Sequence, residues 1–203
     1  MLEKAKKTLI YREIFLLQFF SRYRSSKILF REKKDLSKDL LEKVVSSLPF
    51  ELTEDQKISI DEIFFDLNSS KPMNRLLQGD VGSGKTLVAL LSGLPLIEAG
   101  YQVAFMAPTD LLARQHYDNL SNILAPFNIS MTLLTGSLRK KDKEQALESI
   151  RNGTSGLIVG THAIFTKVQN LKDWRMLSLT NSTNLELFKE KSLKTKEKGW
   201  ICF

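Results

Sequence analysis

Cysteine and histidine are nearly missing from this 203-residue sequence, which has one cysteine, Cys202, and two histidines. A single cysteine cannot form an intramolecular disulfide or a thiolate cluster, so a hydrophobic core has to hold the fold together. Neither His116 nor His162 has a second ligand at a metal-binding spacing. We therefore expect His116 on a helix surface and His162 in a turn, where it positions backbone.

Long hydrophobic runs are also missing. The most apolar stretch, residues 14–20, lies between Arg12 and Arg22 and is far shorter than the ~18 residues that span a membrane. The N-terminus lacks the small-residue cleavage site of a signal peptide. These absences predict a cytoplasmic protein without a membrane partner.

The overall composition is that of a globular protein with room for one ordinary domain and some additional elements. Hydrophobic residues make up 42% of the chain, which is enough for a packed core. The formal net charge is +7. This charge favours a polyanionic partner such as nucleic acid, but ordinary solubilising charge explains it equally well.

The most informative feature that the sequence does contain is a complete phosphate loop. Residues 79–86 read Gly-Asp-Val-Gly-Ser-Gly-Lys-Thr and satisfy the pattern G-x-x-x-x-G-K-S/T between a predicted strand and an apolar helix. The glycines let successive N–H groups surround a polyphosphate at the positive end of that helix. Lys85 is expected to reach the β- and γ-phosphates, and the Thr86 hydroxyl to bind Mg²⁺. The predicted loop ligands of ATP are Gly79, Gly82, Ser83, Gly84, Lys85 and Thr86.

The rest of the chain divides into three parts by pattern. Residues 1–47 form a basic helical lead, with a second helix over 36–46; residues 48–170 alternate strands and helices; residues 171–203 form a polar tail. Strands are predicted at 75–77, 102–106, 131–134 and 157–159, and helices at 53–65, 85–98, 111–124 and 141–152. This alternation predicts an α/β fold with a doubly wound parallel sheet, whose ligands lie at the carboxyl ends of the strands.

Polar residues at these strand ends and upstream of the phosphate loop suggest further contacts. Thr53 and Gln56 have the spacing of a capping box, and the Gln56 amide also matches the hydrogen-bonding groups of adenine. Hydroxyl-rich turns follow three strands at Ala107-Pro108-Thr109, Thr135-Gly136-Ser137 and Gly160-Thr161-His162. Each is an ordinary turn by itself, but three on one sheet edge resemble a track for a nucleic-acid backbone.

These motifs resemble those of the RecG branch-migrating DNA helicases of superfamily 2. The resemblance covers residues 48–168 and rests on the Leu-Leu-Gln-Gly-Asp-Val-Gly-Ser-Gly-Lys-Thr loop, Pro-Phe-Glu-Leu-Thr, Ala-Pro-Thr, Leu-Thr-Gly-Ser-Leu and Gly-Thr-His-Ala. Transcription-repair coupling factors share the loop and the Pro-Thr turn. The basic lead resembles the segment between the family's wedge domain and its motor.

The resemblance implies a RecA-like motor driven by ATP and Mg²⁺ that reverses forks and migrates Holliday junctions. It further implies that Gln56 reads adenine and that Thr109, Gly136 and Thr161 line the DNA side. Branched DNA is the expected partner, and the chain is expected to be a monomer.

One departure from the family pattern predicts that the chain does not hydrolyse ATP. In the family, a strand after the Gly-Thr-His-Ala turn ends in Asp-Glu-x-His, but no Asp-Glu pair follows the phosphate loop here. We therefore assign no catalytic residue and expect an incomplete motor domain that lacks its second half. The tail from residue 171 is expected to be aberrant, as from a shifted reading frame, or disordered. The alternatives are a stand-alone ATP-binding regulatory module, the motor of a translocase that resembles a transcription-repair coupling factor, and another phosphate-loop enzyme, such as a small kinase.

Overall fold

The computed structural model describes residues 35–70, 73–161 and 164, the helical residues 11, 12 and 15, and the backbone of strands at 174–178 and 200–202. The chain forms two compact units, Met1–Phe30 and Arg31–Phe203. In the first unit, the rings of Tyr11 and Phe15 stack at 6.2 Å, as expected for residues one helical turn apart. The remainder of the predicted helical lead up to residue 34 lies outside the described residues.

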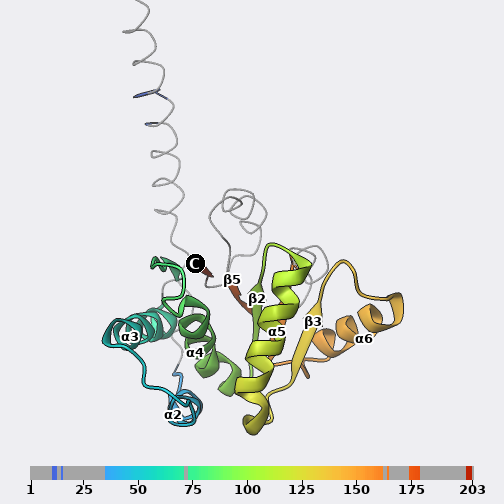
Figure 1. The fold of residues 1–203 in the computed structure, drawn as a ribbon, viewed down its shortest axis with the longest axis horizontal. Coiled ribbons are helices and arrows are strands. Elements are labelled where there is room, and N and C mark those ends of the chain that lie inside the picture. The colour runs from blue at the N-terminus through green and yellow to red at the C-terminus, as the bar shows by residue number, and fades with distance from the viewer. Residues whose placement is uncertain are drawn as a thin grey trace, which may run out of the picture. The chain divides into compact units, whose positions relative to one another are not determined.

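The second unit alternates helices and strands along the chain (Figure 1). Its helices are α2 (Asp39–Ser46), α3 (Glu54–Asn68), α4 (Lys85–Glu98), α5 (Asp110–Leu124) with the short 3-10 helix η1 (Ala125–Phe127), and α6 (Lys140–Arg151). Its strands are β1 (Asn74–Leu76), β2 (Gln102–Met106), β3 (Met131–Leu134), β4 (Leu157–Gly160), β5 (Trp174–Ser178) and β6 (Trp200–Cys202). All predicted helices and strands between residues 36 and 160 are present, with ends that differ by at most three residues.

The strands pair in parallel, as predicted from the alternation of strands and helices. The main sheet has the order β3-β4-β2-β5, and β1 pairs with β6 in a second, two-stranded sheet. Parallel pairing requires each connection to return to the same end of the sheet, which is the role of helices α4, α5 and α6. The loops at the carboxyl ends of these strands therefore gather on one edge.

The sheet buries both of its faces, which is why its strands are almost wholly apolar. Val103 and Phe105 of β2 belong to a core cluster with α2, α3, α4 and α5. Ala104 and Met106 point to the opposite face and pack with Ile150 of α6 in a second cluster. Alternate residues of one strand thus serve two layers of helices, and this confirms the doubly wound α/β class.

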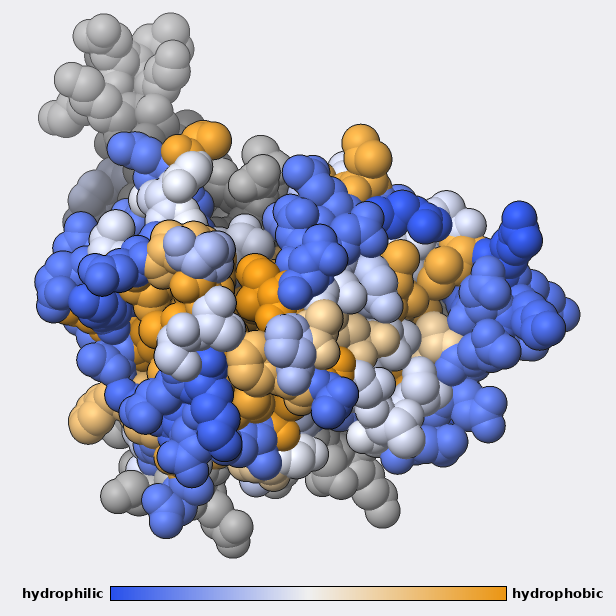
Figure 2. Space-filling model, turned by 60° about the horizontal axis from the view of Figure 1, so that its bottom comes forward, coloured by the Kyte–Doolittle hydropathy of each residue, from blue (hydrophilic) through white to orange (hydrophobic). Residues whose placement is uncertain are grey.

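The face shown in Figure 2 is mainly hydrophilic at its right-hand end, where α6 lies in Figure 1, and has hydrophobic residues gathered toward the middle. Helix α6 is rich in charged residues and buries only Ala146 and Ile150. No helix among the described residues is long and apolar enough to cross a membrane.

Two details differ from the sequence-based expectation. Helix α2 begins at Asp39 rather than at residue 36, because Leu36 is held outside the helix by a 3.0 Å hydrogen bond from its N–H to the Asn68 side chain. The predicted disordered tail contains β5 and β6, so disorder is the wrong description for these two segments. Hydrogen bonding to β2 and β1 supplies their regularity, and tail composition alone gave no sign of those partners. The rest of 171–203 lies outside the described residues.

Candidate nucleotide and nucleic-acid site

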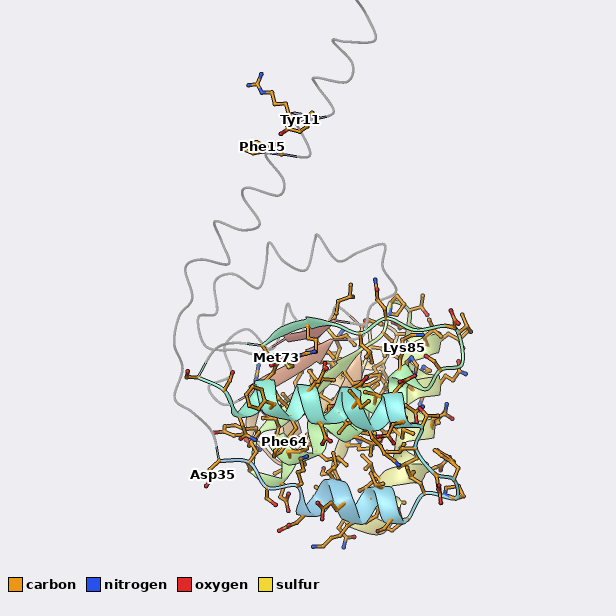
Figure 3. The ribbon with its side chains drawn as sticks, turned by 90° about the vertical axis from the view of Figure 1, so that its left-hand side faces the viewer. Tyr11, Phe15, Asp35, Phe64, Met73 and Lys85 are labelled. Carbon is orange, nitrogen blue, oxygen red and sulfur yellow. The ribbon has the colours of Figure 1, made fainter. Side chains whose placement is uncertain are left out.

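The phosphate loop joins the end of β1 to the start of α4, as predicted. Gly82 and Gly84 have φ angles of 85° and 81°, in the left-handed region that glycine adopts without strain. Lys85 is the first residue of α4, and its position in Figure 3 is near one end of α3. The loop backbone therefore has the curvature that a bound polyphosphate requires.

The Lys85 ammonium lies against the loop in which a phosphate group would bind. Its Nζ donates hydrogen bonds to the carbonyl oxygens of Gly79 at 2.7 Å and Asp80 at 2.6 Å, and lies 3.4 Å from Ser83 Oγ. These are neutral acceptors, and an ammonium binds an anionic phosphate oxygen more strongly than a carbonyl. The side chain is thus already at the loop and would exchange carbonyl partners for phosphates.

Gln56 connects the start of α3 to the phosphate loop. Thr53 and Gln56 form the predicted capping box, in which Thr53 N–H donates to Gln56 Oε1 at 3.0 Å and Gln56 N–H donates to Thr53 Oγ1 at 3.3 Å. The structure adds a contact that the sequence did not predict: Gln56 Nε2 donates to the Ser83 carbonyl oxygen at 2.9 Å. A β-carbon on Gly84 would lie 2.5 Å from the same Nε2 and would displace the Gln56 amide, and the left-handed backbone at this position favours glycine as well.

An ion-pair cluster fixes α3 to the strand that carries the loop. Arg75 of β1 pairs with Glu62 and, through its Nε at 2.8 Å, with Asp66, both on α3. The hydrogen bond with Asp66 is the main reason that the pKa of Arg75 is raised. Glu62 and Asp66 are four residues apart and hence on one helix face, but only the fold shows that Arg75 lies opposite them. Gln56 and the loop are therefore held by the same pair of elements.

The three hydroxyl-rich turns differ in exposure. Thr109 is exposed and caps α5, accepting a 3.3 Å hydrogen bond from Leu112 N–H through its Oγ1. Gly136 is exposed as well. Thr161 is only 5% exposed, and its carbonyl oxygen accepts a hydrogen bond from Ile164 N–H. Thr109 and Gly136 are thus open to a ligand, whereas Thr161 is buried.

Side chains at the start of α5 bind the turn after β3 directly. Ser137 N–H donates to Asp110 Oδ2 at 2.9 Å, and Arg114 Nη2 donates to Ser137 Oγ at 3.3 Å. Hydrogen bonding by Ser137 is the main reason that the pKa of Asp110 lies below its ordinary value. Two of the three turns predicted to face nucleic acid are therefore joined.

Gly160 has a role that the sequence analysis missed. It is the last residue of β4 rather than part of the turn, and a β-carbon there would lie 1.9 Å from the carbonyl oxygen of Leu134. Only glycine allows β3 and β4 to approach this closely at their carboxyl ends.

His116 is half-buried instead of lying free on the helix surface, as we had expected. Its ring meets the buried ring of Phe105 edge-on, with centroids 5.4 Å apart. Burial lowers the pKa of His116, so the imidazole is neutral at neutral pH. His162 lies outside the described residues. No group of three or more His, Cys, Asp or Glu side chains converges on a metal position within the described part of the chain.

The phosphate loop, its parallel sheet and the helices on both faces define an α/β domain of the phosphate-loop class. The DEAD/DEAH box helicase family matches residues 53–185, and the chain belongs to that family.

Individual relatives narrow the likeness further. The chain is 85% identical to the ATP-dependent DNA helicase RecG of Borreliella burgdorferi over 98% of this chain and 29% of the relative. It is 38% identical to the protein of that name from Aquifex aeolicus over 95% of this chain and 25% of the relative. The chain therefore spans little more than a quarter of the length of these relatives. The Borreliella match also extends past residue 171, into the segment that we had expected to be aberrant.

Solved structures of helicase-family proteins are also similar to this chain. A structure of RecG bound to a three-way DNA junction matches with a TM-score of 0.77 and 38% identity over 99% of this chain and 27% of the other. A DEAD box protein from the hyperthermophile Methanococcus jannaschii matches with a TM-score of 0.58 over 86% of this chain and 50% of the other, and its 20% identity supports the fold alone.

Proposed function

We propose that this chain is the ATP- and DNA-binding part of a motor of the RecG type, which acts on branched DNA such as forks and Holliday junctions. The observation that carries the proposal is the phosphate loop, with its left-handed glycines, its lysine in place and its link to Gln56. The RecG relatives, one of them bound to a DNA junction, support the choice of DNA over other partners. We propose that the protein acts in the cytoplasm as a monomer. Size-exclusion chromatography with light scattering tests the monomeric state.

ATP fits the residues at the loop. The cradle is curved for a polyphosphate, Lys85 lies at the loop for the β- and γ-phosphates, and the Gln56 amide lies next to it for adenine. In this role, Gln56 has to release Ser83 or use the second hydrogen of its amide. Thr86 is the residue that would hold Mg²⁺, which when bound neutralises phosphate charge.

Binding without turnover is the second part of the proposal. In phosphate-loop enzymes, a carboxylate helps to hold the metal ion near the γ-phosphate. Strand β5 lies beside β2, with Ser178 paired to Met106, but the residues that follow are Leu179, Thr180 and Asn181. The strand is thus present in the sheet without an acidic residue at its carboxyl end.

The DNA contact is proposed along the turns at Thr109, Gly136 and Thr161. Thr109 and Gly136 support this because they are exposed on one edge and joined through Asp110 and Ser137. Such contacts engage backbone phosphates, so binding should be indifferent to base sequence and weaken as salt rises.

Isothermal titration of ATP into the wild-type chain and Lys85→Ala tests the first part. Removal of the ammonium leaves the phosphates with one charge-assisted partner fewer, a loss of about 1.5–3 kcal/mol, or at least tenfold in affinity. DNA binding and the melting temperature should be unchanged, because within the described part of the chain the hydrogen bonds of Lys85 go to its own loop. Equal ATP affinity for the two folded proteins would refute the assignment of the loop.

A further inference from the structure

Asp110 introduces a negative charge on the edge where we propose that DNA phosphates bind. It is the first residue of α5 and follows Thr109, whose hydroxyl caps the helix. A carboxylate in this position is favoured by the helix dipole, but it repels an incoming phosphate. The residue therefore opposes the function proposed for its neighbours unless it has another task.

The contacts of Asp110 show what that task is. Its Oδ2 accepts the 2.9 Å hydrogen bond from Ser137 N–H, and a β-carbon on Gly136 would be 4.0 Å from the same oxygen. One turn along α5, Arg114 reaches the Ser137 hydroxyl, which also lies 3.3 Å from Thr135 Oγ1. The Asp110 carboxylate thus binds the backbone N–H of Ser137, and the Arg114 guanidinium from the same helix binds its side-chain hydroxyl.

The two turns need such a connection because the sheet does not place them side by side. Thr109 follows β2 and Gly136 follows β3, and β4 lies between these two strands. The turns are therefore separated by one strand, and side chains have to cross that gap. Asp110 and Arg114 cross it from the β2 side.

We propose that Asp110 is a positioning residue that sets the distance between the turns at Thr109 and Gly136, so that both meet one DNA strand. The inference rests on the proposed DNA contact. The negative charge of Asp110 weakens DNA binding, whereas its hydrogen bond to Ser137 N–H strengthens binding by holding the two turns in place. Charge and reach can be separated because an asparagine keeps the acceptor oxygen and loses the charge.

Asp110→Asn and Asp110→Ser form a matched pair for the test. Both are uncharged and both suit the start of a helix, but the serine hydroxyl is too short to reach Ser137 N–H. Affinity for an oligo-dT strand is measured by fluorescence anisotropy at several salt concentrations. Asp110→Asn should bind about threefold more tightly than the wild type, since a repulsive charge is gone. Asp110→Ser should bind about fivefold more weakly than Asp110→Asn, with the same salt dependence, because one backbone hydrogen bond is lost.

The outcomes separate this inference from the function on which it rests. If both variants bind DNA equally, Asp110 acts only through its charge and the positioning role is refuted. If Asp110→Asn is weaker than the wild type, the carboxylate contributes directly and the inference is refuted as well. If the wild-type chain binds no DNA, the proposed DNA contact fails and the inference falls with it. ATP affinity and the melting temperature report whether each variant is folded.

Discussion

The phosphate loop and the edge proposed to bind nucleic acid, formed by the turns at Thr109 and Gly136, lie on one domain but are built in different ways. The loop is eight consecutive residues whose own backbone forms the cradle, and Lys85 binds two carbonyl oxygens five and six residues away and the Ser83 hydroxyl two residues away. The edge is assembled from separate turns, and Asp110 reaches 27 residues along the chain to hold Ser137. We therefore expect a substitution elsewhere in the sheet to disturb the geometry of the phosphate loop less than the geometry of the edge.

The net positive charge and the α/β fold lie in different parts of the chain. Residues 1–34 contain ten Lys and Arg and three Glu, so the whole formal net charge of +7 resides there. The remainder has equal numbers of basic and acidic residues, and α3 carries several exposed acidic side chains. The positive charge that suggested nucleic acid is therefore supplied by the lead and not by the edge with Thr109.

ATP turnover is the largest difference that an experiment should find between this chain and a complete motor. We expect phosphate release in the presence of ATP, Mg²⁺ and branched DNA to equal that of Lys85→Ala, since the residues directly after β5, Leu179, Thr180 and Asn181, include no acidic one. A malachite green assay measures it. Sustained release that Lys85→Ala abolishes would mean that a residue outside the described part supplies the carboxylate.

Glycine substitutions on the two sites should have unequal effects on stability. Gly160→Ala places a β-carbon 1.9 Å from the Leu134 carbonyl oxygen and should lower the free energy of unfolding by about 3 kcal/mol. Gly82→Ala meets no atom within 4 Å and should cost only the about 1–2 kcal/mol of its left-handed backbone. Urea denaturation compares the two. Equal losses would contradict the close approach of β3 and β4.

Gln56→Ala and Thr53→Ala sharpen the description of the nucleotide site. Each breaks the capping box and should destabilise α3 by about 1 kcal/mol. Only Gln56→Ala also removes the bond to Ser83 and the proposed adenine contact, so ATP affinity should fall about fivefold further. The preference for ATP over GTP should shrink in Gln56→Ala alone. If both variants lose affinity equally, Gln56 serves only as a cap.

The smallest expected effect is on the pH dependence of stability and concerns His116, on the side of α5 that faces the sheet. Burial lowers its pKa in the folded chain, so the neutral ring is favoured by folding. Its contribution to stability is complete above the unfolded pKa near 6.5 and is lost as the pH falls through that value toward the folded pKa. Thermal melts at pH 7 and pH 5 should show a smaller loss for His116→Leu than for the wild type. An identical loss would mean that the ring is not desolvated.

Much of the architecture could be predicted because its signals are local. The apolar pattern of residues 85–98 and the loop before it predicted α4 with its observed ends, and the Thr53–Gln56 spacing predicted the capping box. The cases that sequence reasoning missed all involve a distant partner. Gly160 was assigned to a turn because the Leu134 carbonyl oxygen is not visible from its neighbours, and His116 was placed on the surface because Phe105 belongs to another element. The tail was considered disordered because strand partners, rather than composition, make β5 and β6 regular.

The sequence by itself determined the phosphate grip, since eight adjacent residues carry the glycines, the lysine and the hydroxyl that a polyphosphate requires. It also determined the succession of strands and helices, because periodicity and capping act over a few residues. Only the tertiary structure decided which side chains meet: Gln56 with Ser83, Arg75 with Glu62 and Asp66, and Asp110 with Ser137. The physical reason is that a hydrogen bond acts over about 3 Å of space, whatever the separation along the chain. Parallel strands with long crossovers bring together residues that no local pattern connects.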